Sequence, residues 1–251
     1  MATVAVLADP PVEGFALSGL VEGTPLSESE AASLYSAMLT DVCRAVQASG
    51  ADLLVNYRDP EQVPGDVDSE QVLRDTLTDA LEEPGASRYE VQVGETFAGR
   101  AGNTATHLLE SEGERSVALV EPTAPFLGRQ QIGEAAMKIR NSDVVIGPAP
   151  GGRVYFAGFS EPIDFDDAYA MPAMETLTDR ARDADLSVDF LPQSPVVETP
   201  ADLADAVTHV RSRLRAARNV PIETATVVDD LGLYAEPTDD GLSVARTGDR
   251  P

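Results

Sequence analysis

The chain is predicted to fold as an α/β protein, a three-layer sandwich in which a mainly parallel sheet carries helices on both faces. Two observations lead to this prediction. Short apolar, β-prone segments alternate along the chain with longer amphipathic segments, which is the order that parallel strands with crossover helices require. The length of 251 residues with 43% apolar content is enough for one sizeable core.

The elements follow one another in a regular order. The expected strands cover residues 3–7, 53–56, 89–93, 117–120, 144–146, 154–156 and 186–191. The expected helices cover residues 27–50, 69–81, 104–111, 129–140, 172–184 and 201–218. Strands and helices alternate with one exception, because a Gly/Pro loop joins the strands 144–146 and 154–156 directly as a hairpin.

The first long helix has clear signals at both ends. Ser27 with Glu30 three residues later forms a capping box, and Gly50 ends the helix. Its apolar stripe consists of Leu34, Tyr35, Met38, Leu39, Val42 and Val46. This spacing is typical of a helix that packs one face against a core.

The loop inside the hairpin is the first candidate for a binding site. Gly147-Pro148 and Pro150-Gly151-Gly152 exclude a helix and allow the backbone to approach a bound group closely. A ligand floor and a purely structural hairpin both fit this pattern.

The chain beyond the last core helix is predicted to be an appendage of residues 219–251 on a domain of residues 1–218. Thr224 is expected to cap a helix that ends at Gly232. The expected hairpin strands cover residues 233–235 and 242–245. Such an appendage either closes an edge of the sheet or builds a dimer contact.

Charge restricts the environment and the partners. The sequence has 18 basic and 43 acidic residues, a formal net charge of −25, and Lys138 is its single lysine. Carboxylates keep such a surface hydrated at high ionic strength, where a Debye length of about 3 Å at 1 M screens their repulsion. We therefore expect a halophilic protein that loses its fold on desalting. Nucleic acid and anionic membranes are excluded as partners, because both are bound through clustered Lys and Arg.

Several common classes of site are excluded as well. Cys43 is the single cysteine, so a disulfide scaffold and a zinc knuckle cannot form within the chain. No Gly-x-Ser-x-Gly elbow and no P-loop is present. His107 and His209 lie on expected helices and are expected to serve packing. Neither a transmembrane span nor a signal peptide is expected, which predicts a cytoplasmic protein.

Five segments, taken in order, resemble the motifs of one family. Residues 147–158 keep Gly147, Pro148, Ala149, Gly152, Tyr155 and Gly158 of the motif Gly-Pro-Ala-acid-Asp-Gly-Gly-Tyr-Tyr-Leu-x-Gly-Leu. Residues 8–20 keep Ala8, Pro11, Val12, Gly14 and Leu20 of Ala-Lys-x-Pro-x-Pro-Gly-Arg-x-Lys-Thr-Arg-Leu. The other three segments keep Gln92, Gly94, Gly99 and Arg100, then Pro125 and Leu127, and then Thr199, Pro200, Asp202 and Leu203. Together, across residues 3–210, they resemble the GT-A-like family of rSAM/selenodomain-associated transferase 1, a relative of nucleotide-sugar glycosyltransferases and of 2-phospholactate guanylyltransferase.

The resemblance implies a GT-A-like fold and a nucleotide or nucleotide-sugar ligand above the carboxyl ends of the parallel strands. The implied ligand-binding residues are Pro11, Gly14, Arg100, Glu121, Thr123, Gly151, Gly152 and Arg153. It also implies Mg²⁺ or Mn²⁺, for which Glu121 and Glu198 are the remaining candidate ligands.

Four positions at which the family has carboxylates are neutral in this chain. They are Thr123, Pro150, Gly151 and Val196. A transferase-like protein with weakened or lost catalysis is therefore expected. One alternative is a non-enzymatic scaffold or regulatory homo-oligomer on the same fold. Another is a metal-free enzyme in which Arg100 and Arg153 neutralise the phosphates.

Overall fold

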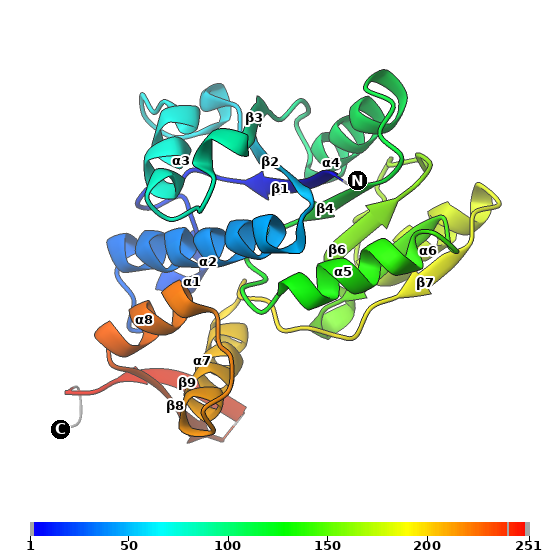
Figure 1. Cartoon of the computed structure of the whole chain (residues 1–251). Helices are drawn as coiled ribbons and strands as arrows, with labels where there is room; N and C mark the ends of the chain where they lie inside the picture. The colour runs from blue at the N-terminus through cyan, green and yellow to red at the C-terminus, as the bar shows by residue number, and fades with distance from the viewer. Residues whose placement is uncertain (1–2, 240, 249–251) are drawn as a thin grey trace.

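A seven-stranded sheet forms the centre of the computed structural model, which describes residues 3–239 and 241–248. The strand order is β3-β2-β1-β4-β6-β5-β7, and β6 alone runs antiparallel to its neighbours. Helices cover both faces of the sheet (Figure 1). The predicted α/β architecture with a mainly parallel sheet is confirmed.

The bounds of the elements are close to those expected. The strands are β1 (Thr3–Ala8), β2 (Asp52–Tyr57), β3 (Arg88–Val91), β4 (Val117–Val120), β5 (Val144–Pro148), β6 (Val154–Phe159), β7 (Val188–Phe190), β8 (Leu233–Thr238) and β9 (Gly241–Arg246). The α-helices are α1 (Ser18–Val21), α2 (Glu28–Ser49), α3 (Ser69–Thr78), α4 (Phe97–Thr106), α5 (Arg129–Lys138), α6 (Ala173–Asp183), α7 (Pro200–Arg215) and α8 (Ile222–Asp230). The predicted hairpin is the antiparallel pair β5 and β6.

Strand β1 lies in the middle of the sheet and is buried on both faces. Val4 and Val6 join the core beneath α2, α3 and α5, whereas Ala5 and Leu7 join the core beneath α4 and α6. Successive side chains of a strand point to opposite faces, so one apolar strand contributes to two cores. This is why the buried strands of the chain are apolar throughout rather than alternating in polarity.

The helix expected from residue 104 begins earlier, at Phe97, so that prediction is wrong at its start. The side chain of Thr96 caps it by accepting the Gly99 N–H at 3.0 Å. Glycines lower the local helix propensity and conceal the first turns in the sequence. Gly102 is required by packing, since a Cβ there would lie 2.5 Å from Phe165. The helix ends in a π-helical turn, His107–Ser111.

A helix and a hairpin follow α7, as predicted, but Thr224 does not cap the helix, because α8 already begins at Ile222. The cap comes instead from Asp41 of α2. Its Oδ1 accepts the Glu223 N–H at 3.1 Å, and its Oδ2 accepts the Thr224 N–H at 2.8 Å and the Thr224 hydroxyl at 2.7 Å. Arg44 forms an ion pair with Glu223 beside it. We call Asp41, Arg44, Glu223 and Thr224 the appendage junction.

The hairpin β8–β9 also packs against the body of the protein. Leu233 and Val244 share a core with α2, α7 and α8. Arg246 forms an ion pair of 2.8 Å with Glu30, the residue that completes the capping box of α2. The boundary at residue 218 stays a prediction. Over the described part of the chain, no helix is long and apolar enough to cross a membrane.

Candidate functional site

The carboxyl ends of four parallel strands meet at one edge of the sheet, where a cavity of about 70 Å³ lies. Residues that follow directly on β1, β2, β3 and β4 line it, together with residues of α2 and α4. The lining residues are Leu7, Asp9, Tyr35, Arg58, Gln92, Phe97, Arg100, Glu121, Pro122 and Thr123. We call this cavity the strand-end cleft. In open α/β sheets, ligands bind outside the carboxyl ends of the strands.

Hydrogen bonds between strand ends hold the walls of the cleft in place. Gln92 donates from Nε2 to the carbonyl oxygen of Asn56 at 2.7 Å. The N–H of Asp9 donates to the Tyr35 hydroxyl oxygen at 2.8 Å, and Arg58 Nε donates to Asp9 Oδ1 at 2.9 Å. These hydrogen bonds connect α2 with the ends of β1, β2 and β3, and they fix the walls of the cleft without a ligand.

Two buried polar atoms of the cleft lack a hydrogen-bond partner among the described residues. Arg100 is 4% exposed, and its Nη1 donates to the Glu95 carbonyl oxygen at 2.9 Å while its Nε has no acceptor. Thr123 is 8% exposed, and its hydroxyl is also unpaired. Leaving such a group buried and unpaired costs about 1–3 kcal/mol each. Folded proteins seldom retain such groups unless water, an ion or a ligand supplies the partner.

The charges of the cleft favour an anion. Burial raises the pKa of Glu121 to about 8, and the nearby carboxylates of Glu198 and Asp9 add to this effect while Arg100 and Arg153 oppose it. Glu121 is therefore mostly neutral at pH 7. Asp9 is paired with Arg58. Over the described residues, Arg100 has no carboxylate within ion-pair distance, and Asp9 and Glu121 act on its charge only from farther away.

A second cluster beside the cleft contains two of the predicted residues. Arg153 binds both oxygens of Asp202 at 2.7 Å and Glu198 Oε2 at 3.0 Å. These carboxylates raise the pKa of Arg153 further above its ordinary value. Gly152, at a φ of 78°, allows the loop to lie against Pro172, since a Cβ there would come within 2.8 Å. Arg153 and Glu198, predicted to bind phosphate and metal, are thus bound to each other.

The remaining predicted residues lie in loops outside the cleft. Gly14 has a φ of 72°, and a Cβ there would lie 3.1 Å from Glu28. Pro11 precedes it in the same half-exposed loop, and neither lines the cleft. Phe15 of this loop lies beneath Arg58, with the guanidinium 5.9 Å from the ring centre. The structure brings Arg100, Glu121 and Thr123 together and keeps Pro11, Gly14, Gly151 and Gly152 apart from them.

Arg58 is the residue of the cleft that the sequence interpretation missed. It follows β2 just as Asp9 follows β1 and Glu121 follows β4. That position directly after a buried strand is the signal that identifies it. Arg58 lies outside the five segments that resemble the family, so the resemblance did not reveal it.

A metal site of several carboxylates is not present in the cleft. Over the described residues, the grouping of three candidate ligands within 4.8 Å of one another is Glu90, His107 and Glu112, which lie outside the cleft. Of the carboxyl groups at the strand ends, Glu198 is bound to Arg153 and Asp9 to Arg58, so Glu121 alone has no cationic partner within ion-pair distance among the described residues. The residues at the strand ends therefore do not fit a protein-held divalent cation, which prefers charged oxygen ligands.

Comparison with protein families and with curated proteins finds no match for the chain. Among solved structures, it resembles a protein from Desulfovibrio desulfuricans G20 whose assignment as a nucleotide-diphospho-sugar transferase is provisional. The TM-score is 0.73 and the identity 22%, over 92% of this chain and 95% of that one.

Two further solved structures share the architecture at lower similarity. The 4-diphosphocytidyl-2C-methyl-D-erythritolsynthase of Anaerococcus prevotii DSM 20548 has a TM-score of 0.51 and 13% identity, over 84% of this chain and 96% of that one. A cytidylyltransferase from Leptospira borgpetersenii serovar Hardjo-bovis strain JB197 has a TM-score of 0.51 and 7% identity, over 92% and 94%. At these identities the likeness establishes the fold, which is that of nucleotide-diphospho-sugar transferases and cytidylyltransferases.

Proposed function

We propose that the strand-end cleft binds a phosphate group of a nucleotide or nucleotide-sugar, in a transferase-like protein with weakened or lost catalysis. The observation that carries this proposal is the pair of buried, unpaired polar groups, Arg100 Nε and the Thr123 hydroxyl. Both can donate a hydrogen bond to the same kind of ligand atom, an oxygen. The ligand would remove the cost of leaving them unpaired.

The chemistry of the walls favours phosphate over a neutral polar ligand. The Arg100 guanidinium, which lacks a carboxylate partner among the described residues, would form charge-assisted hydrogen bonds with phosphate oxygens. A mostly neutral Glu121 would not repel the anion at pH 7. The solved structures of the same fold support a nucleotide as the carrier of that phosphate, because by name they are a provisionally assigned nucleotide-diphospho-sugar transferase, a synthase of a diphosphocytidyl compound and a cytidylyltransferase.

The size of the cleft limits what enters it. About 70 Å³ holds a small group, whereas pockets that enclose a whole small-molecule ligand have roughly 300–1,000 Å³. The ribose and base would therefore lie outside, over the ends of β1 and β4. Membership in the family that the motifs resemble is part of this proposal.

We infer weakened catalysis from the residues that would have to hold a metal ion. A phosphoryl or nucleotidyl transfer gains from a cation that neutralises the departing diphosphate. When Mg²⁺ or Mn²⁺ is bound in such a site, it supplies this neutralisation. Here Glu198 is held by Arg153, and Thr123 stands where the resembled family has an aspartate. Only cations of the chain itself, Arg58 and Arg100, are in place.

A direct binding measurement tests the proposal. We expect isothermal titration of nucleoside diphosphate sugars, in molar KCl with and without Mg²⁺, to show binding to the unmodified chain and at least about 10-fold weaker binding to Arg100→Gln. Arg140→Gln, at an exposed position after α5, is the matched control and should bind normally. Because Arg100 is buried, Thr123→Val serves as a second variant that keeps the fold. Absence of binding to the unmodified chain would contradict the proposal.

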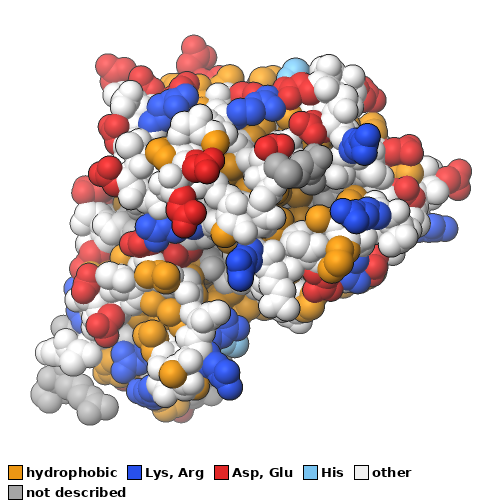
Figure 2. Space-filling model, in the orientation of Figure 1, with side chains coloured by type: hydrophobic (Ala, Val, Ile, Leu, Met, Phe, Trp, Pro, Cys, Tyr) orange, Lys and Arg blue, Asp and Glu red, His pale blue; other side chains and the backbone are white. Residues whose placement is uncertain are grey.

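One observation favours the second candidate, a non-enzymatic scaffold or regulatory oligomer. Apolar side chains are exposed on and next to the appendage: Leu214 by 48%, Ile222 by 66% and Leu242 by 43%. Figure 2 shows apolar side chains gathered over the region of α8. If these residues form an interface, sedimentation of the unmodified chain in molar KCl should reveal an oligomer that Ile222→Glu dissociates. A monomer would exclude this candidate.

A further inference from the structure

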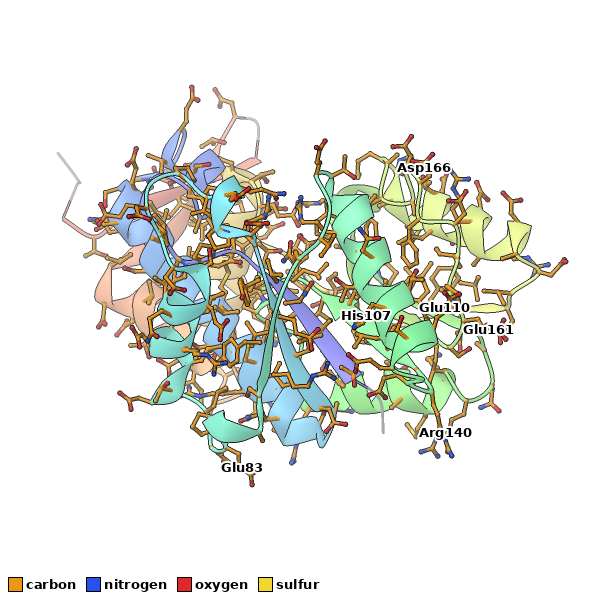
Figure 3. All side chains as sticks on the ribbon, turned by 90° about the horizontal axis from the view of Figure 1, so that it is seen from above. Glu83, His107, Glu110, Arg140, Glu161 and Asp166 are labelled. Carbon is orange, nitrogen blue, oxygen red and sulfur yellow. The ribbon has the colours of Figure 1, made fainter. Side chains whose placement is uncertain are left out.

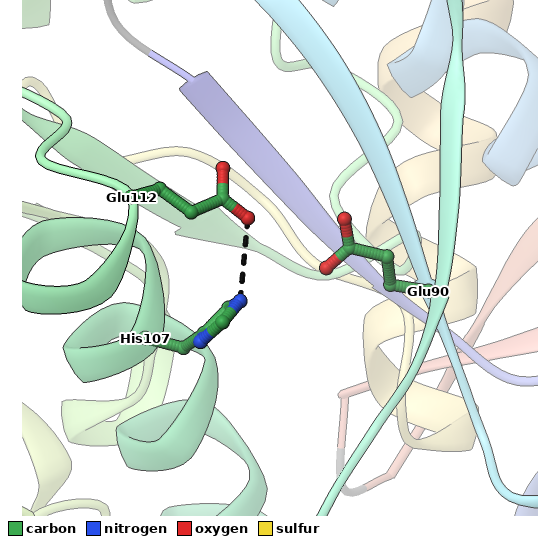
Figure 4. Close-up of side chains that lie close together, drawn as sticks. All are labelled: Glu90, His107 and Glu112. Atoms are coloured by element: carbon green, nitrogen blue, oxygen red, sulfur yellow. Dashed lines mark ion pairs between the residues drawn. The ribbon is translucent and has the colours of Figure 1, made fainter.

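A side-chain cluster outside the strand-end cleft combines one imidazole with two carboxylates. Glu90 extends from β3, His107 begins the π-helical turn, and Glu112 follows it. His107 Nε2 lies 3.3 Å from Glu112 Oε1, and one ligand atom from each of the three residues lies within 4.8 Å of the others. Figure 4 shows the three side chains pointing toward one another from two separate elements.

The π-helical turn creates this proximity. The Glu112 N–H donates to the His107 carbonyl oxygen at 3.1 Å, a hydrogen bond between residues five apart. In an α-helix of roughly 3.6 residues per turn, residues five apart point about 140° away from each other. The wider turn places both side chains on the same side, facing the edge strand. Single π-turns within helices are frequent at functional sites.

A cation of the chain already occupies the position between the carboxylates. Arg88 Nη2 donates to Glu112 Oε1 at 2.6 Å and Nη1 to Glu112 Oε2 at 2.8 Å, and Nη2 also pairs with Glu90. The pair is open to solvent, because the side chains of Arg88 and Glu112 are 38% and 27% exposed. Because these ion pairs are partly exposed, an ion from solution can reach the same carboxylates and compete with Arg88 for them.

A cavity adjoins the cluster and leaves room for further ligands of an ion. It has about 70 Å³ and is lined by Glu90 and His107 together with Asn56, Val91, Val93, Asn103, Thr104 and Leu108. His107 is 55% exposed at its side chain, so an ion can reach it from solution. Figure 3 shows His107 on the same helical segment as Glu110.

We propose that Glu90, His107 and Glu112 form a binding site for a divalent transition-metal ion, with Zn²⁺ as the best-suited ion, and that Arg88 is an internal cation that competes with it. An imidazole nitrogen with two carboxylate oxygens suits Zn²⁺, which takes three protein ligands and a water in open sites. Mg²⁺ prefers an all-oxygen set and is disfavoured here. The site is independent of the cleft and of any transfer reaction.

The test is a titration of the full-length chain with Zn²⁺ at pH 7.5 in molar KCl without chelating buffer. One ion should bind per chain, and Mg²⁺ at the same concentration should not compete for it. The two histidines of the chain provide a matched pair of variants. His107→Ala should weaken binding at least about 10-fold, because one of three ligands is lost, whereas His209→Ala should bind as the unmodified chain does.

Three further variants distinguish a built site from the general attraction of an acidic surface. Glu112→Gln should weaken binding, whereas Glu110→Gln, an exposed residue of the same π-helical turn, should not. Arg88→Gln should strengthen binding, since the competing cation is removed. All five side chains are at least partly exposed, so the variants are expected to fold, and their thermal unfolding without metal checks this. Equal Zn²⁺ affinity of His107→Ala and His209→Ala would overturn the proposal, as would weaker binding by Arg88→Gln.

Discussion

A buried threonine accompanies a carboxyl group of raised pKa in both the strand-end cleft and the appendage junction. Thr123 and Glu121 line the cleft, and Thr224 and Asp41 form the junction. The threonines are 8% and 2% exposed, and burial raises the pKa of both carboxyl groups. At the junction the hydroxyl donates to Asp41 at 2.7 Å, whereas in the cleft the hydroxyl has no partner among the described residues.

This difference in hydrogen bonding separates buried polar groups that stabilise the fold from buried polar groups that await a partner. A buried group with all its hydrogen bonds made contributes to holding elements together, as Asp41 does by capping α8 from a distant helix. A buried group without a partner weakens the fold by itself, and its retention points to a ligand. The junction is therefore a structural contact, and the cleft is the proposed binding site, although their residue types are nearly the same.

We expect the largest change in stability when the salt concentration is lowered, and this change affects the cleft and the junction alike. With a formal charge of −25, self-repulsion at low ionic strength should unfold the whole chain, because a Debye length of about 30 Å at 0.01 M no longer screens it. Circular dichroism during dialysis from molar to millimolar KCl measures this. A melting temperature that is independent of the KCl concentration would show that the acidic surface does not make folding depend on salt. The cleft and the junction could then be compared at any salt concentration.

The next largest effect should come from the junction. Asp41→Ala removes three hydrogen bonds and leaves the first N–H groups of α8 unpaired, so the free energy of unfolding should fall by about 3 kcal/mol. Denaturant titration in molar KCl measures the change. Asp52→Ala, at an exposed position at the start of β2, is the control and should change stability little. A loss of unfolding free energy below about 1 kcal/mol would mean that the hydrogen bonds of Asp41 stabilise the junction no more than the unpaired groups stabilise the cleft.

The cleft should respond to pH through Glu121. Its pKa is raised to about 8 from 4.5, so between these values the folded state holds a proton that the unfolded state has released. Stability therefore falls as the pH rises through this window. Because the side chain keeps part of its exposure, we expect the loss across it to be about 2 kcal/mol, well below the ideal limit. Glu121→Gln should abolish this loss, and denaturant titrations at pH 5 and pH 8.5 compare the two proteins.

We expect the smallest changes in stability from replacing the two buried threonines by valine, and these changes should have opposite signs in the junction and the cleft. Thr224→Val removes the hydrogen bond to Asp41 and should cost about 1 kcal/mol. Thr123→Val removes an unpaired hydroxyl while keeping the shape, so stability should stay equal or rise by up to about 1 kcal/mol, while phosphate-ligand binding weakens. Parallel melting curves and titrations measure both quantities. Equal destabilisation by the two substitutions would contradict the contrast between cleft and junction.

Much of the candidate site could be predicted, and the failures have a common cause. Arg100, Glu121 and Thr123 were predicted from motifs and strand ends, and the structure gathers them in one cavity. Whether they bind a ligand stays a prediction. The prediction that Thr224 caps α8 is wrong because the cap comes from Asp41, which lies far away in the sequence. The early start of α4 is not predicted because Gly102 lowers the local helix signal, and its reason is the contact with Phe165, a residue far away in the sequence.

The sequence by itself determined the order of strands and helices, the mainly parallel sheet and the acidic surface, because periodicity, capping signals and composition are properties of neighbouring residues. Only the tertiary structure decided which polar groups are paired. It joined Arg153 to Glu198 and Asp202, left Arg100 facing an open cleft, and brought His107 and Glu112, at the two ends of a π-helical turn, to Glu90 of β3. Such pairings join residues that lie far apart along the chain, so no local pattern encodes them.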